Sequence, residues 1–189
     1  MTISLLVSWA LLSIYGCIPV WSFSSNTQKR CFIVTGSSGY VGREIVHALV
    51  EHASSTRQQA PTASAAKDDA IICLVRPSRV EEEKTYWRQS DHIVVMPYNM
   101  LDEGKTLRDA LDTALAFEPS QCCIYHVASV FGPTEDHVQT ALENVRGTED
   151  VVSTITRHPL LPRCRLILTS SMAAVRATGQ KPKNGVAYT

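Results

Sequence analysis

The chain alternates short apolar runs with longer segments in which apolar residues recur every three or four positions. Apolar runs lie at 31–35, 71–75, 92–96, 123–128 and 166–169. Their length and continuous hydrophobicity are typical of strands buried on both faces of a sheet. Because a helical period follows each of the first four runs, the pattern predicts an α/β fold with a parallel sheet and helices on both faces.

Helices are expected at four places between these strands. The first ends near His52, and Val41, Ile45, Ala48 and Leu49 form its apolar stripe. A charged helix is expected over 81–88, and a third helix presents Leu107, Ala110, Leu111, Ala114 and Leu115. The fourth has an expected inner stripe of Val138, Ala141, Leu142, Val145, Val152 and Ile155. Five strands connected in this way predict a doubly wound sheet with the strand order 3-2-1-4-5.

Two segments fall outside this alternation. Residues 53–69 are rich in Ala, Ser, Thr and Gln without an apolar period, which predicts a surface insertion. Residues 1–28 contain no charged side chain, and 3–20 are mostly apolar. This leader is interpreted as a targeting segment: a cleaved signal peptide of the secretory pathway, a membrane anchor in contact with a bilayer, or a presequence into a secondary plastid. We therefore divide the chain into a leader, 1–28, and one domain, 29–189.

The turn between the first strand and the first helix carries three glycines at three-residue spacing, Gly36, Gly39 and Gly42. A strand, a glycine turn and a helix together are typical of a Rossmann-type dinucleotide site. One glycine permits the sharp turn, another lets the backbone approach the pyrophosphate, and the third lets the helix pack close to the strand. The helix N-terminus then offers free N–H groups to the phosphates. The segment predicted to bind the cofactor comprises Gly36, Ser37, Ser38, Gly39, Tyr40, Val41 and Gly42.

Composition narrows the class of partner further. The net charge is 0 and the isoelectric point about 7.0, so the chain lacks the basic character of a nucleic-acid-binding protein. Of six cysteines, five lie in or beside predicted strands and Cys17 lies in the leader. No Cys/His spacing typical of a metal site occurs, so we interpret the cysteines as buried free thiols and expect no metal.

Four motifs in this order resemble the extended short-chain dehydrogenase/reductase superfamily, the NAD-dependent epimerase/dehydratase family. They are V-T-G-S-S-G-Y-V-G at 34–42, Y-H-V-A-S at 125–129, N-V-R-G-T at 144–148 and L-T-S-S-M-A-A-V at 168–175. The second motif and the tail at 185–189 resemble its dihydroflavonol-reductase-like branch. The resemblance covers about residues 31–189.

Cofactor contacts are expected at the carboxyl ends of several strands. Arg76 follows the second strand, where an acidic residue would accept from a ribose 2′-hydroxyl and an arginine suits a 2′-phosphate. We therefore predict NADP rather than NAD. The resemblance implies that Asn99 meets the adenine, and that Val127, Ala128 and Ser129 lie against the ribose and nicotinamide. His126 is interpreted as a packed strand histidine, and Asn144 as a partner of the neighbouring strand end.

The resemblance implies that Ser171 is the active-site serine, which binds the oxygen of a small-molecule substrate. The same enzymes need a tyrosine with a lysine four residues later, and no tyrosine of this sequence has one. The expected function is thus an NADP-dependent carbonyl or alcohol reductase, of which this chain is a cofactor-binding fragment. The alternatives are a sugar-nucleotide epimerase/dehydratase, a 3β-hydroxysteroid dehydrogenase, or a catalytically silent dinucleotide-binding module.

Overall fold

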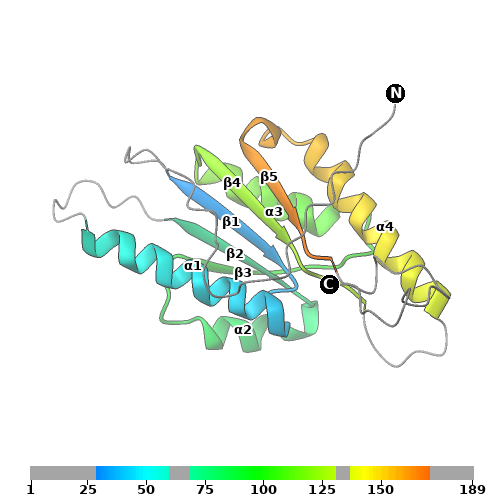
Figure 1. Cartoon of the computed structure of the whole chain (residues 1–189), viewed down its shortest axis with the longest axis horizontal. Helices are drawn as coiled ribbons and strands as arrows, with labels where there is room; N and C mark the ends of the chain where they lie inside the picture. Colours follow the sequence, from blue (N-terminus) through cyan, green and yellow to red (C-terminus); the bar gives the residue numbers. More distant parts are fainter. Residues whose placement is uncertain (1–28, 60–68, 131–136, 171–189) are drawn as a thin grey trace, which may run out of the picture.

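The computed structural model describes residues 29–59, 69–130 and 137–170, which form one sheet with helices on both of its faces (Figure 1). The strands are β1 (Arg30–Thr35), β2 (Ala70–Val75), β3 (Ile93–Pro97), β4 (Gln121–His126) and β5 (Cys164–Leu168). The α-helices are α1 (Tyr40–Gln59), α2 (Val80–Tyr86), α3 (Lys105–Ala116) and α4 (His137–Thr156). Two 3₁₀ turns, η1 (Pro77–Arg79) and η2 (Leu161–Arg163), precede α2 and β5.

All strand pairs are parallel, and the order is β3-β2-β1-β4-β5. The predicted fold class and strand order are therefore confirmed. Within the sheet, Val34 of β1 pairs with Cys73 of β2 on one side and Tyr125 of β4 on the other. Because the strands are parallel, their carboxyl ends meet at one edge, where this class of sheet binds its ligands.

The sheet separates two hydrophobic layers. On one face, α1 and Trp87 pack against Val34, Ile71 and Cys73. On the other face, α3 and α4 pack against side chains that alternate with these along the strands, such as Ile33 and Ile72. The alternation explains why β2 is buried at every position and reads as a continuous apolar run.

The first helix is longer than the sequence pattern predicted. It continues past His52 to Gln59, seven residues into the segment interpreted as an insertion. Ser54 and Ser55 donate their hydroxyls to the carbonyls of Val50 and Glu51, which keeps these polar residues within the helix. Its buried side is centred on Gly42, Val46 and Ala53, whereas Val41 and Ala48 of the expected stripe are exposed.

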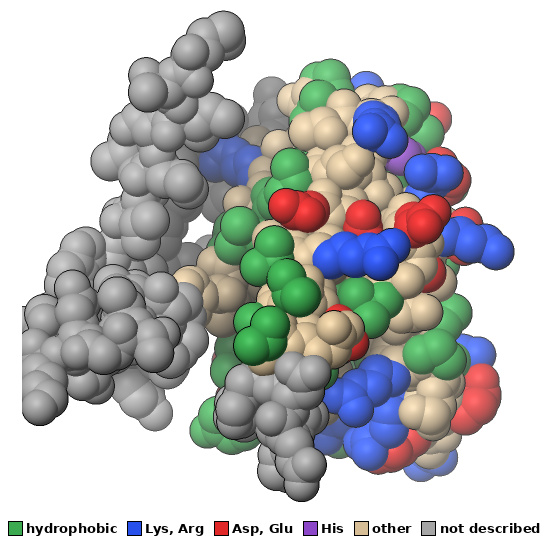
Figure 2. Space-filling view, turned by 90° about the vertical axis from the view of Figure 1, so that its right-hand side faces the viewer, with side chains coloured by type: hydrophobic (Ala, Val, Ile, Leu, Met, Phe, Trp, Pro, Cys, Tyr) green, Lys and Arg blue, Asp and Glu red, His purple; other side chains and the backbone are tan. Residues whose placement is uncertain are grey.

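The expected inner stripe of α4 is wrong for most of its members. Val138, Leu142, Val145 and Val152 are 42–71% exposed, and Ala141 is also exposed. The buried side instead includes Gly147, Val151, Thr154 and Ile155. Apolar residues occupy two sides of this helix, so their period alone does not identify the side that meets the sheet. Figure 2 shows the side of the molecule that lies on the right in Figure 1, and on it hydrophobic side chains lie beside charged side chains of both signs.

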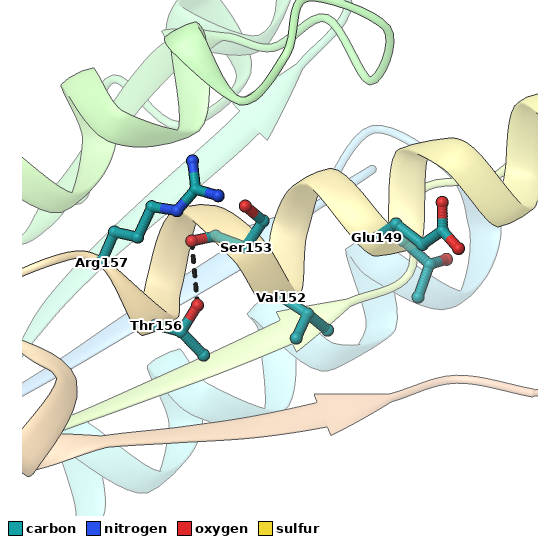
Figure 3. A pocket seen from close by; sticks show the side chains of 6 residues that line it. Glu149, Val152, Ser153, Thr156 and Arg157 are labelled. Carbon is teal, nitrogen blue, oxygen red and sulfur yellow. Dashed lines mark hydrogen bonds between the residues drawn. The ribbon is translucent and has the colours of Figure 1, made fainter.

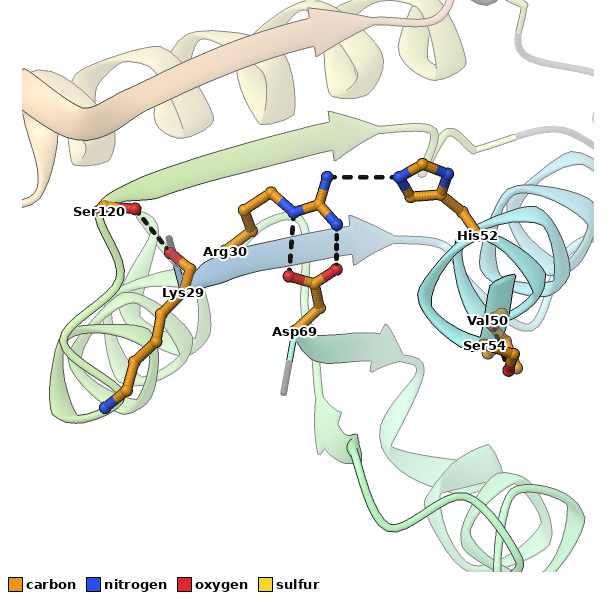
Figure 4. Close-up of polar contacts among 7 residues, drawn as sticks. All are labelled: Lys29, Arg30, Val50, His52, Ser54, Asp69 and Ser120. Carbon is orange, nitrogen blue, oxygen red and sulfur yellow. Dashed lines mark hydrogen bonds and ion pairs between the residues drawn. The ribbon is translucent and has the colours of Figure 1, made fainter. Parts of the chain in front are cut away.

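The amino ends of the strands are held by a polar cluster opposite the ligand edge. Arg30 pairs through two nitrogens with the carboxylate of Asp69, and its third nitrogen lies 3.3 Å from Nε2 of His52 (Figure 4). Beside it, Ser120 donates both its N–H and its hydroxyl to the carbonyl of Lys29. One guanidinium thus connects the start of β1 to the residue that precedes β2 and to α1.

Several predictions lie outside the described residues: the leader, Cys17, most of the insertion, Ser171 and the tail. None of the helices in the described part is long and apolar enough to cross a membrane. Within it, Cys31, Cys73 and Cys122 are buried free thiols in the strands. Burial raises the pKa of the Cys73 thiol to about 12, which keeps it protonated and unreactive.

Candidate functional site

The glycine turn connects the carboxyl end of β1 to α1. Gly36 has a φ of +69°, a left-handed conformation that residues with a Cβ rarely adopt. Its N–H donates to the carbonyl of Leu74 on β2 at 2.9 Å, and Gly39 N donates to Gly36 O at 2.9 Å. The turn is therefore hydrogen-bonded to itself and to the neighbouring strand.

The three glycines are required for different reasons. A Cβ on Gly42 would lie 2.2 Å from the carbonyl oxygen of Gly36, so the helix or the turn would have to shift to accept it. A Cβ on Gly36 would lie 2.9 Å from both N and Cα of Ala128 in the segment after β4. At Gly39 the nearest atom would be 3.2 Å away. The helix thus packs directly on the turn, and the turn directly on the β4 segment.

This geometry fits a dinucleotide diphosphate. The first N–H groups of a helix have no partner within that helix, and here they lie beside an exposed glycine, Gly39, where a phosphate can approach the backbone. Tyr40 and Val41 are exposed at the same helix end. Ser37 is fully buried, and both its hydroxyl and its N–H donate to Leu74 O, so this residue stabilises the turn.

A hydrogen-bonded network joins this turn to the next strand. The Oγ1 of Thr35, the last residue of β1, accepts the N–H groups of Val127 and Ala128, both at 3.1 Å. The same oxygen lies 2.9 Å from Nδ1 of His126. Because both N–H groups can only donate, the threonine hydrogen is directed to His126, and Nδ1 accepts it. Thr35 therefore fixes two of the residues predicted to lie against the cofactor.

The network continues into α4. With Nδ1 as an acceptor, a neutral His126 carries its proton on Nε2, which lies 3.5 Å from the hydroxyl of Thr148. Thr148 donates to the carbonyl of Asn144, and the Asn144 side chain bonds both N and O of Val130. Asn144 therefore holds the backbone that follows β4, in agreement with its predicted structural role.

His126 is packed as predicted, with 5% of its surface exposed. Burial lowers its pKa below the usual 6.5, because desolvation disfavours the charged imidazolium. A protonated ring would also place a second donor against the Thr35 hydroxyl. Both effects favour the neutral ring that the hydrogen bonds require.

The other predicted cofactor residues lie at the same edge. Arg76 is exposed and directly follows β2, and Ser129 is exposed after β4. Asn99 is exposed two residues beyond β3, and its Oδ1 accepts the N–H of Leu101 at 3.1 Å. Its carboxamide is thus oriented by its own loop. The structure places residues 36–42, Arg76, Asn99 and 127–129 at the carboxyl ends of four adjacent strands.

Burial raises the pKa of Tyr98 and of Tyr125 above the usual value for a phenol. A general acid in carbonyl reduction needs a phenol whose pKa is shifted toward the working pH. These two tyrosines are therefore unsuited to that role. A shallow hollow elsewhere is lined by side chains of α4, among them Glu149 and Val152, and by Arg157, which directly follows that helix, and it includes none of the predicted cofactor residues (Figure 3).

Comparison with known proteins places this geometry in a family. The model of the NAD dependent epimerase/dehydratase family matches residues 32–188. The chain belongs to this family. The assignment to the extended short-chain dehydrogenase/reductase superfamily, predicted from the four motifs, is confirmed. No curated protein matches the chain.

Solved structures of similar fold include several reductases. A short-chain dehydrogenase/reductase from Saccharomyces cerevisiae is 17% identical with a TM-score of 0.56, covering 78% of this chain and 56% of its own. ElxO with NADPH bound is 13% identical, with a TM-score of 0.57 and coverages of 79% and 58%. NADPH-bound carbonyl reductase from chicken fatty liver is 13% identical, with a TM-score of 0.50 and coverages of 77% and 58%. The chain spans 38–58% of the length of the first three structures it matches.

Thr35 is a residue of the candidate site that the sequence pattern did not single out. A hydroxyl in the last position of an otherwise apolar strand, directly before the first glycine, is the signal that identifies it. The sequence pattern also did not predict the ion pair between Arg43 and Glu83, because 40 residues separate the two partners.

Proposed function

We propose that this chain binds NADP at the carboxyl edge of its sheet and serves an oxidoreductase that interconverts a carbonyl and an alcohol on a small or phenolic substrate. The observation that carries the proposal is the contact of the glycine turn with the β4 segment. Gly36 packs on Ala128, and Thr35 bonds the N–H groups of Val127 and Ala128. The predicted diphosphate and nicotinamide regions are therefore parts of one rigid surface.

Support for NADP over NAD comes from the end of β2. The four residues that follow it are Arg76, Pro77, Ser78 and Arg79, without a carboxylate to accept a ribose hydroxyl. Arg76 is exposed and available to a 2′-phosphate, for which a guanidinium provides paired donors.

In the proposed reaction, NADPH supplies the hydride. The N–H groups at the start of α1 bind its diphosphate, Asn99 meets its adenine, and residues 127–129 support its nicotinamide ribose. The hydrogen bonds of Thr35, His126 and Asn144 hold the backbone of residues 127–130 in place. Ser171, which lies outside the described residues, is proposed to donate its hydroxyl to the substrate oxygen. The general acid is not assigned to Tyr98 or Tyr125, because burial raises the pKa of both phenols.

Calorimetric titration of the full chain with NADP⁺ and NAD⁺ tests the proposal, together with the substitution Arg76→Asp. We expect the wild type to bind NADP⁺ more tightly than NAD⁺. Arg76→Asp should weaken NADP⁺ about 10- to 100-fold, because a charge-assisted contact worth about 1.5–3 kcal/mol is replaced by repulsion. The affinity for NAD⁺ should change little.

A matched control is Arg157→Asp, which makes the same charge change at an exposed position just after α4, on the side of the sheet where β5 begins. It should leave both affinities within about twofold of the wild type, since an exposed charge at the opposite edge of the sheet is largely screened from the cofactor. A wild type that binds neither cofactor would refute the function. Equal losses for both cofactors in Arg76→Asp would refute the role of Arg76 in NADP preference.

A further inference from the structure

Arg43 and Glu83 form an ion pair between the first turn of α1 and α2. Arg43 directly follows Gly42, and its Nη2 bonds Oε1 of Glu83. The Glu83 side chain is fully buried, whereas that of Arg43 is 29% exposed. A buried carboxylate is costly unless a cation compensates it, so this contact constrains where α2 can lie.

Aromatic packing restricts the same arginine further. The Cζ of Arg43 lies 4.6 Å from the centre of the Tyr86 ring, within the range of a cation–π contact. Tyr86 OH lies 3.0 Å from Nε2 of His47, and the His47 and Trp87 rings are 4.9 Å apart. The guanidinium is thus fixed by a carboxylate and a ring, and both belong to α2.

Through α2, this contact reaches Arg76. Arg76 itself is extended, but Pro77–Tyr86 is helical without a break: Arg79 N donates to Arg76 O at 2.8 Å, and Val80 N donates to Pro77 O where η1 passes into α2. A displacement of α2 therefore moves Arg76. At its other end the segment continues β2, whose Leu74 carbonyl accepts the N–H of Gly36.

The segment that carries Arg76 is consequently attached to the glycine turn at both ends. One attachment is the backbone hydrogen bond from Gly36 N to Leu74 O, which does not depend on a side chain. The other is the Arg43–Glu83 pair, which depends on these two side chains.

We propose that the Arg43–Glu83 pair is a specificity-determining positioning device that sets the place of Arg76 relative to the diphosphate-binding turn, and thereby the preference for NADP over NAD. The inference rests on the proposed function. Neither residue is required to touch the cofactor, since the effect is transmitted through α2.

Glu83→Gln is the decisive variant, because electrostatics and positioning predict opposite results. Removal of a negative charge near a phosphate site strengthens phosphate binding if charge alone matters. Loss of the ion pair instead releases α2. The positioning account predicts that the ratio of the NAD⁺ to the NADP⁺ dissociation constant falls at least fivefold, through weaker NADP⁺ binding. An unchanged ratio, or tighter NADP⁺ binding, overturns the inference.

The matched control is Glu82→Gln, the neighbouring residue on the same helix. Glu82 is exposed and pairs only with Arg79 three residues earlier in the contacts that the described part shows. The charge change is the same but no contact to α1 is lost, so the ratio should stay within about twofold. A fall equal to that of Glu83→Gln would show a charge effect and would also overturn the inference.

Arg43→Lys provides a second variant in case Glu83→Gln does not fold. It keeps the charge but loses the planar group that stacks on Tyr86, so the ratio should again fall, by at least threefold. A wild-type ratio in a folded Arg43→Lys protein overturns the inference. A wild type that binds neither cofactor refutes the proposed function instead, and an Arg76→Asp protein with an unchanged ratio refutes the role of Arg76, so both failures are distinguishable from a failure of the ion pair.

Discussion

At the scale of single residues, the site depends on one hydroxyl and one imidazole. The Thr35 hydroxyl accepts two N–H groups and donates to His126, so all of its hydrogen-bonding capacity is used. His126 connects this oxygen to α4, because its Nε2 lies beside the hydroxyl of Thr148. Buried polar groups of this kind are favourable only when each has its partners, and the loss of one leaves the others unsatisfied. Residues that never touch a cofactor can therefore determine its site.

The protonation of His126 makes a testable contribution to stability. Its pKa is lowered in the folded protein, so the unfolded chain binds the proton more tightly. The stability from the neutral ring is complete above the unfolded value of 6.5 and is lost as the pH falls toward the folded value. We expect the free energy of unfolding to decrease below pH 6.5 by at most about 1.4 kcal/mol per pH unit from this group.

Urea unfolding of the wild type and of His126→Asn, at pH 7.5 and in steps down to 5.0, measures this contribution. Asparagine offers an acceptor near the place of Nδ1 and does not titrate, so the variant should lose less stability over the same range. A variant with the same pH dependence as the wild type would exclude His126 as its source.

At the scale of elements, the decisive contact is between α1 and the turn that precedes it. Gly42→Ala would place a Cβ 2.2 Å from Gly36 O, so the helix must move away from the turn. We expect a loss of about 1–3 kcal/mol in the free energy of unfolding, as for other overpacked sites, and at least tenfold weaker NADP⁺ binding. Thermal melts and calorimetric titration measure the two effects.

Gly39→Ala is the control for this effect, since its Cβ would meet its nearest atom at 3.2 Å and Gly39 has no left-handed φ. Its stability should remain within about 1 kcal/mol of the wild type. Equal destabilisation by the two substitutions would show that the tight contact at Gly42 is not what α1 depends on.

The elements also show which features the sequence could predict. The central strand β2 is a continuous apolar run because helices cover both of its faces. Such runs alternate with helical periods along the chain, so the fold class and the strand order followed from the pattern. The side of α4 that meets the sheet did not follow, because Val138, Leu142 and Val145 form an apolar row of their own on its exposed side. The spacing of apolar residues within one helix cannot show which of two apolar sides meets the sheet.

The site was predictable to the extent that its function depends on the backbone. Glycine spacing predicted the turn, since the need for φ > 0 and close approach limits the residue types. Thr35, His126 and Thr148 act through side chains from three elements, and Arg43 meets Glu83 across 40 residues. Such contacts are created by tertiary structure and leave no periodic trace in the sequence.

At the scale of the whole molecule, the two edges of the sheet have different roles. The amino edge is joined by Arg30, Asp69 and Ser120, which stabilise the start of the strands. The carboxyl edge carries the glycine turn, Arg76, Asn99 and the segment after β4. Cofactor binding is proposed to occur at the carboxyl edge alone, where four strand ends meet.

Hydrogen–deuterium exchange of the full chain, with and without saturating NADP⁺, tests this central claim most directly. Peptides that cover 36–42 and 127–129 should exchange more slowly with the cofactor, because it shields their N–H groups and rigidifies the turn. Peptides that cover 117–120, beside Lys29 at the opposite edge of the sheet, should be unchanged. Unaltered exchange at the glycine turn, or protection confined to other segments, would contradict the account.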